Sequence, residues 1–299
     1  MTRTTFTRRT FGLTLAATIA TGGGAYLLRR PAASSPEEVA ARAIAIGQAN
    51  GLRIDYGNPA SFFLPPYSSR DATIPDGHVT KAEITDVAAA LDGIEQSLAV
   101  YPPGFYATLA KAIFICGTLR FGNERAGGTY GPAWIIIAAD PSVGDDGIRE
   151  TARLGVHHEF SSLLLLRQPS VQARWQALLP AGWQPEQRSD EALRHTGDRD
   201  VRDGFLSAYA ATSLENDFNT YAETAFGAPD RLVALAAGNP RVRQKAELLL
   251  QAYEASDVRM KQTYQKLGLE SLASDVPAMP ADLHIAPAQL PTPTIDTAN

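Results

Sequence analysis

The sequence predicts an α+β fold that is mainly helical and contains a small β-sheet. The runs 112–121 and 126–140 are rich in β-branched and apolar residues, which is typical of buried strands. Most of the remaining chain has helical periodicity or helix-capping residues. Its composition, 44% hydrophobic and 20% charged, is ordinary for a soluble globular protein. A chain of 299 residues is long enough to bury a sizeable core.

Capping residues predict two helices in the first third of the chain. Ser35 and Pro36 precede two glutamates, and this combination favours a helix start because the serine caps it and the acids lie at the positive end of the helix dipole. Thr80 and Glu83 have the spacing of a capping box, which predicts a second helix ending near Pro102. Between the two helices, Pro and Gly residues indicate loop with a short strand.

Further helices are expected in the second half of the chain. The stretch 144–168 reads as one long helix, and residues 170–200 look irregular. Ser213, followed by acidic residues, predicts a helix reaching about residue 226. The stretch 239–268 reads as one final amphipathic helix.

The N-terminus resembles a twin-arginine export signal. Arg8 and Arg9 follow Thr7 and precede Phe11, and an apolar run then extends to about Leu28. No Ala-x-Ala cleavage site follows, and the run is near the ~20 residues that a membrane span requires, so the segment is either removed or retained as a membrane anchor. We therefore expect an exported protein that is periplasmic, membrane-anchored or secreted.

This reading divides the chain into three parts. Residues 1–34 form the signal or anchor with its linker, and residues 35–276 form one domain. The tail 277–299 is rich in Pro, Ala and Thr and is predicted to be disordered.

Charge and cysteine content exclude some function classes. A net charge of -5 and a pI of about 5.6 argue against general nucleic-acid binding, which needs a basic face. Cys116 is the single cysteine, so the chain forms no internal disulfide and no Cys-rich zinc module. Its apolar, β-branched neighbourhood predicts a buried and unreactive thiol.

The stretch "HHEFSS" at 157–162 carries part of a zinc motif. In His-Glu-x-x-His, the two histidines project from one helix face and bind one zinc, while the glutamate reaches the zinc-bound water. His158 and Glu159 fill the first two places, but Ser162 stands where the second histidine belongs. A neutral serine hydroxyl is a poor zinc ligand beside imidazole.

Other motifs appear in a fixed order around this stretch. The set is "YPPGF" at 101–105, Cys116, "RAG" at 125–127, "HHEF" at 157–160, "GFLSAYA" at 204–210 and "ENDFNTYAE" at 215–223. Over roughly residues 85–226 this order resembles a group of exported bacterial zinc-binding metallopeptidases with a gluzincin-like core. The resemblance implies a small sheet packed on a zincin-type active-site helix, with a second helix facing it and further helices at the C-terminus. It also implies that residues 129–138 lie at the sheet edge, where an extended peptide pairs.

The resemblance also implies roles for individual residues. His158 is a zinc ligand, Glu159 is the general base, and Tyr209 stabilises the oxyanion. Glu215 or Asp217 supplies an acidic ligand. This last assignment stays open, because alignment on Phe218 places Asn216 at the ligand position whereas alignment on the first acid places Glu215 there.

Three forms of the altered site are compatible with the sequence. A zinc site could be rebuilt from His157 or His158, an acidic residue of the 215–217 segment, and His195. A weaker metal could be held by fewer protein ligands and more waters. Alternatively, no metal binds, and His158, Glu159 and Ser162 join the acidic helix in a buried polar network.

Two main functions follow from these alternatives. The first is an exported zinc-metallopeptidase-like protein that hydrolyses peptide bonds at an altered metal site, with a peptide or protein as substrate. The second is a catalytically inactive descendant that binds a peptide, a glycan or an envelope partner. A helical scaffold protein with an incidental resemblance is a third, weaker option.

Overall fold

The computed structural model describes residues 35–59, 62, 77–186 and 198–273. The predicted export signal, the C-terminal tail and His195 lie outside these ranges. Within them the chain folds as a mainly helical α+β domain with a small mixed sheet, which confirms the predicted class. No helix in the described ranges has the length and apolar character needed to cross a membrane.

The larger sheet has four strands in the order β1 (Arg53–Asp55), β3 (Ala112–Cys116), β7 (Trp134–Ala138) and β6 (Gly128–Gly131). The first three strands are parallel, and β6 pairs antiparallel with β7. β6 therefore forms one edge of the sheet. Within the predicted edge segment 129–138, only the β6 residues lie at this edge, because β7 is an interior strand.

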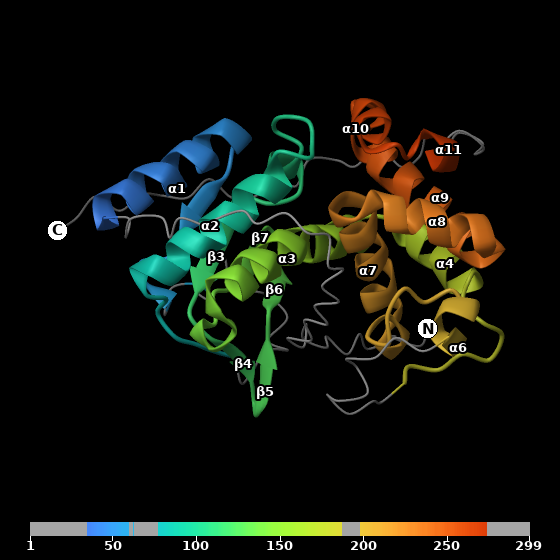
Figure 1. Ribbon diagram of the computed structural model, residues 1–299, viewed down its shortest axis with the longest axis horizontal. Coiled ribbons are helices and arrows are strands. Elements are labelled where there is room, and N and C mark those ends of the chain that lie inside the picture. Colours follow the sequence, from blue (N-terminus) through green and yellow to red (C-terminus); the bar gives the residue numbers. More distant parts are fainter. Residues whose placement is uncertain (1–34, 60–61, 63–76, 187–197, 274–299) are drawn as a thin grey trace, which may run out of the picture.

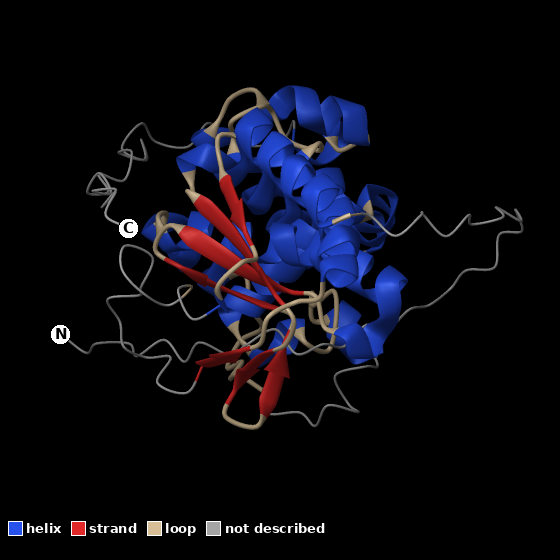
Figure 2. Cartoon of the chain, turned by 90° about the vertical axis from the view of Figure 1, so that its left-hand side faces the viewer, coloured by secondary structure: helices blue, strands red, loops and turns tan. Residues whose placement is uncertain are grey.

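A second sheet contains three short antiparallel strands, β2 (Gly77–Val79), β4 (Leu119–Phe121) and β5 (Glu124–Ala126). Figure 2 shows the strands of both sheets on one side of the molecule, with most of the helices on the other.

Successive side chains of β3 and β7 point to opposite faces of the larger sheet, and both faces are apolar. One face packs against the helices in the main core, and the other packs with Phe62 and the small sheet. Cys116 lies buried on the second face, and its burial raises the pKa of the thiol, as predicted for an unreactive cysteine. The helix-facing residues are Ile113, Ile115, Ile135 and Ile137; the opposite face carries Phe114, Cys116, Trp134, Ile136 and Ala138.

The helices surround α3, the longest of them (Figure 1). α3 packs against α2, α7 and strands β6 and β7, so it lies between the sheet and the C-terminal helices. The described helices are α1 (Pro36–Asn50), α2 (Ile84–Leu98), α3 (Gly144–Leu166), α4 (Pro169–Ala177), α6 (Asp198–Arg202), α7 (Leu214–Gly227), α8 (Pro229–Gly238), α9 (Pro240–Ser256), α10 (Met260–Leu267) and α11 (Glu270–Ala273), with 3-10 turns η2 (Tyr106–Thr108), η3 (Pro141–Val143) and η4 (Ala210–Thr212).

Close contact between α2 and α3 depends on Gly93. A Cβ atom at this position would lie 2.1 Å from the carbonyl oxygen of Arg149 in α3. The missing side chain lets the two backbones approach, which fixes one side of α3.

Local capping signals predicted some helix starts correctly. Ser35 caps α1, and its side chain and that of Glu38 form a reciprocal capping box. The prediction for Thr80 is wrong: α2 begins after Glu83 without a side-chain cap, and Oγ1 of Thr80 accepts a hydrogen bond from the backbone of Thr118 instead. A partner thirty-eight residues away in sequence is invisible to a local capping pattern.

Two predicted strands are divided in the structure. The run 112–121 forms β3 and β4, which belong to different sheets, because Gly117 lies where the chain changes sheet. A Cβ atom there would lie 2.7 Å from the carbonyl oxygen of Lys81, so only glycine permits the approach. The run 126–140 likewise contains the end of β5, all of β6 and all of β7.

Two helix predictions in the second half also need correction. Residues 169–177, expected to be irregular, form α4, which begins at Pro169 and buries Val171 and Trp175. The predicted single helix over 239–268 is two helices, because the chain turns extended at Asp257 between α9 and α10.

Candidate functional site

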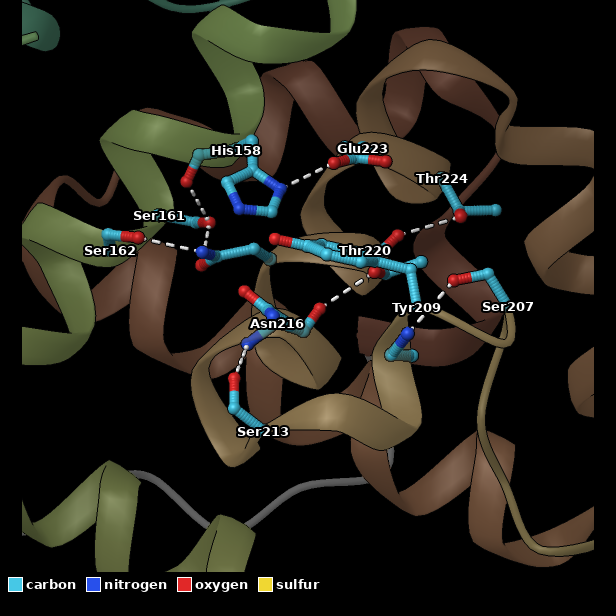
Figure 3. Close-up of polar contacts among 12 residues, drawn as sticks. His158, Ser161, Ser162, Ser207, Tyr209, Ser213, Asn216, Thr220, Glu223 and Thr224 are labelled. Carbon is cyan, nitrogen blue, oxygen red and sulfur yellow. Dashed lines mark hydrogen bonds and ion pairs between the residues drawn. The ribbon is translucent and has the colours of Figure 1, made fainter. Parts of the chain in front are cut away.

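The candidate site lies where α3 meets α7. Ser213 caps α7 by accepting a hydrogen bond from the backbone of Asn216, as the sequence predicted. α7 then places Asn219 and Glu223 against α3, where His158, Ser161 and Ser162 are all buried. Figure 3 shows the polar contacts that join the two helices.

His158 is oriented by a carboxylate of α7. Its Nδ1 lies 2.5 Å from Oε1 of Glu223, and both side chains are largely buried. Burial alone lowers the pKa of His158, but the hydrogen bond and charge of Glu223, together with the charges of Glu159 and Glu215, outweigh it and raise the pKa above its ordinary value. The protonated form of His158 is therefore stabilised, and Glu223 holds its Nδ1.

Ser162, at the altered motif position, is bound to Asn219. Nδ2 of Asn219 donates to Oγ of Ser162 at 2.7 Å. At the other end of the same amide, Oδ1 lies 2.5 Å from Oγ of Ser161, which also lies 2.7 Å from the carbonyl oxygen of His158. Both ends of the Asn219 amide are thus engaged by α3.

Tyr209 belongs to the same group of side chains. Its ring centroid lies 6.1 Å from that of His158, and Figure 3 shows its side chain extending toward the histidine. Burial, followed by the negative charges of Glu159, Glu223 and Glu215, raises the pKa of the Tyr209 hydroxyl well above its ordinary value. The structure therefore brings Tyr209 together with His158, Glu159 and Glu215, four of the residues singled out from the sequence.

Glu159 lies against the edge strand of the sheet. Its side chain is buried, and a Cβ atom at Gly128 in β6 would lie only 2.6 Å from Oε1 of Glu159. The same Cβ would lie 3.0 Å from the carbonyl oxygen of Ile136 in β7. The absence of a side chain at Gly128 provides the space that the Glu159 carboxylate occupies.

Replacement of Gly128 by alanine is expected to lower the free energy of unfolding by about 1–3 kcal/mol, because the added methyl group overpacks the contact between β6 and Glu159. Chemical denaturation of the variant and the native protein measures the difference. Gly238→Ala is a matched control, since a Cβ atom there would meet nothing within 4 Å. Equal stability of the Gly128→Ala variant and the native protein would contradict the close approach.

Asp217, a candidate acidic ligand, is engaged elsewhere. Its Oδ2 lies 2.6 Å from Nζ of Lys245 and accepts a hydrogen bond from Nε1 of Trp175 at 2.8 Å. The carboxylate and the ammonium group are both fully buried, and burial raises the pKa of Asp217 and lowers that of Lys245. Asp217 is therefore part of a structural ion pair that joins α7 to α9.

The buried ion pair also contacts the segment that leads to Tyr209. Nζ of Lys245 donates to the carbonyl oxygen of Gly204 at 2.8 Å, and the hydroxyl of Tyr221 donates to the same oxygen at 2.9 Å. The backbone at Gly204 is thereby fixed to both α7 and α9.

His157, the second candidate histidine, points into the core. Its Nδ1 lies 2.8 Å from the hydroxyl of Tyr101, and its Nε2 is buried without a hydrogen-bond partner. Burial, followed by the positive charge of Arg153, lowers the pKa of His157 to about 3. Consecutive helix residues point about 100° apart, which is why His157 does not share the site of His158.

The segment 215–217 thus supplies two residues near the site. Glu215 is close enough to influence the pKa of both His158 and Tyr209. Asn216 hydrogen-bonds to the side chain of Tyr209 and also donates to Oγ1 of Thr212 at 2.8 Å. The sequence analysis missed Asn219 and Glu223. Their four-residue spacing matches that of His158 and Ser162, but this match identifies them only once the contact between α7 and α3 is known.

The residues that the structure describes do not fit a catalytic zinc site. Such a site needs three protein ligands of the His, Asp, Glu or Cys type around one point. Across the described ranges, no group of three such side chains is arranged to hold a metal ion. On the face of α3 that carries His158, the next position is Ser162, and its hydrogen-bond partner is a neutral amide.

Comparison of the chain with protein-family models, with curated proteins and with solved structures found no match. The functional assignment therefore rests on the residues and contacts described above.

Proposed function

We propose that this chain is an exported, metallopeptidase-like protein that binds a peptide or another envelope partner and does not hydrolyse it. The proposal combines the twin-arginine-like N-terminus and the ordered motifs of the sequence with the α3–α7 site. On this proposal the domain is zincin-like, and α3 is the helix that carries the altered motif.

One observation carries the proposal: the hydrogen bond of 2.7 Å between Asn219 and Ser162. It fills the place one helical turn beyond His158, where a peptidase of this kind has its second zinc-binding histidine. A hydroxyl and an amide that bind each other satisfy their hydrogen-bonding capacity without an ion. The site is therefore completed by a polar network, in line with the metal-free alternative.

The arrangement around Glu159 supports binding beside α3. The carboxylate of Glu159 adjoins β6, the edge strand of the larger sheet, and the hydroxyl of Tyr209 is near the same carboxylate. The sequence resemblance places an extended peptide at a sheet edge, and a carboxylate there would select basic or hydrogen-bond-donating side chains. All four β6 residues and Glu159 are buried, so a peptide would have to displace what covers them. We expect the partner to be an extended peptide segment that carries such donors.

The purified native chain tests this proposal directly. After dialysis against zinc and removal of free metal, elemental analysis is expected to find no stoichiometric zinc, and mass spectrometry of a peptide library is expected to find no cleavage. Peptide-array binding is expected, with selected sequences bound more weakly by the Glu159→Gln variant. Stoichiometric zinc together with cleavage that Glu159→Gln abolishes would overturn the proposal.

Peptide-bond hydrolysis at an altered metal site is the second candidate function. The His158–Glu223 pair favours it, because histidines that bind metals commonly have a carboxylate on the other ring nitrogen. The same elemental analysis and cleavage assay separate the two functions.

A further inference from the structure

We infer that Ser162 and Asn219 jointly replace two ligands of one metal ion, so that both must change before the site accepts zinc. This inference rests on the proposed relationship to metallopeptidases. It assigns the lost third ligand to position 219 in place of Glu215, Asn216 or Asp217.

The residues through which α3 and α7 contact each other have the same spacing on both helices. On α3, His158 and Ser162 are four residues apart and share one face; on α7, Asn219 and Glu223 do the same. His158 pairs with Glu223 at 2.5 Å, and Ser162 pairs with Asn219 at 2.7 Å. The contacts thus form two rungs between the helices, one charged and one neutral (Figure 3).

The His158–Glu223 pair resembles a metal-binding histidine together with the carboxylate that orients it. A carboxylate on Nδ1 of a histidine fixes the ring and leaves Nε2 as the nitrogen that faces away from that carboxylate. Glu223 holds Nδ1 of His158 in this way. The neutral rung, one turn along each helix, then corresponds to the two remaining ligand positions.

The two neutral residues depend on each other. The hydroxyl of Ser161 engages the oxygen end of the Asn219 amide, so the amide nitrogen faces Ser162. An amide nitrogen carries only donor hydrogens and cannot bind a cation. A histidine introduced at position 162 alone would meet this donor, and a carboxylate introduced at position 219 alone would meet only a serine.

Two of the three neighbouring candidates are committed to other contacts. Asn216 donates to Thr212 and hydrogen-bonds to Tyr209, and Asp217 is bound by Lys245 and Trp175. Neither reaches the Ser162 hydroxyl, whereas Asn219 binds it. This difference supplies a matched control at position 216.

The test compares four variants of the full chain: Ser162→His, Asn219→Glu, the double variant Ser162→His/Asn219→Glu, and the control Ser162→His/Asn216→Glu. Each is loaded with zinc, freed of excess metal and measured by elemental analysis. We expect about one zinc per chain in the double variant alone, as a three-ligand site predicts. Zinc is also expected to raise the melting temperature of that variant only.

A further change tests the role of Glu223. Adding Glu223→Gln to the double variant is expected to weaken zinc binding by about 10–100-fold, measured by competition with a chromophoric chelator. Circular dichroism checks folding throughout, and Ser162→His/Asn219→Asp keeps the size of the asparagine if the longer glutamate prevents folding.

The inference is overturned by stoichiometric zinc in Ser162→His alone, by equal zinc in the position 216 control, or by a folded double variant without zinc. Stoichiometric zinc in the native chain would overturn both the inference and the proposed function. The three results above overturn the inference alone, and peptide cleavage by a native chain without stoichiometric zinc would remove the proposed function alone.

Discussion

Replacement of Lys245 by methionine is expected to lower the free energy of unfolding by about 3–5 kcal/mol, because it leaves the Asp217 carboxylate buried without its cation. The two groups lie 2.6 Å apart and neither is exposed to solvent. Urea denaturation at neutral pH measures the effect. A loss below about 1 kcal/mol, which is typical of an exposed ion pair, would contradict the burial of this pair.

Two controls separate the ion pair from general effects of the substitution. Lys261→Met removes the exposed partner of Glu254, whose side chain lies 3.0 Å away, and is expected to change stability by less than about 1 kcal/mol. Asp217→Asn/Lys245→Met removes both charges, and is expected to recover much of the stability lost in Lys245→Met.

The free energy of unfolding is also expected to fall between about pH 6.5 and pH 3, with His157 as one identifiable cause. The pKa of His157 is lowered from 6.5 to about 3 by burial and by Arg153. In this window the unfolded chain binds a proton at this histidine that the folded chain does not, so stability rises with pH. A shift of this size corresponds to at most about 5 kcal/mol.

The neighbouring histidine provides the control. The pKa of His158 is raised, so its stabilising contribution is fully present below its unfolded pKa and is lost as pH rises through its folded pKa. Unfolding curves over a pH series are expected to show a shallower acid decline for His157→Asn than for His158→Asn. An unchanged acid decline in His157→Asn would contradict the neutral, buried state of His157.

Local signals in the sequence predicted those elements that depend on neighbouring residues. Ser35 and Ser213 mark helix starts because a capping serine bonds to the backbone within the same turn. Thr80 has the same local pattern, but its hydroxyl instead accepts a hydrogen bond from the backbone of Thr118, in the connection between β3 and β4. The division of the runs 112–121 and 126–140 into separate strands likewise depends on contacts between distant parts of the chain.

The same distinction explains what was predicted of the site. The motif placed His158 and Glu159 on one helix, and the order of the other motifs pointed to Tyr209 and the α7 segment. The position of Asn219 could not be predicted from residue types alone, because it depends on which face of α7 meets α3. A four-residue spacing in both helices suffices to identify that face once their contact is known.

The carbonyl oxygen of Gly204 links the interior of the C-terminal helices to the site. It accepts hydrogen bonds from Lys245 in α9 and Tyr221 in α7, and Tyr209 follows it by only a few residues. Lys245 thereby ties α9 to the backbone that leads to Tyr209, although it does not itself bond to the site residues on α3. A substitution at Lys245 is accordingly expected to loosen the segment that carries Tyr209, so a change far from the α3–α7 contact would still reach one of its residues.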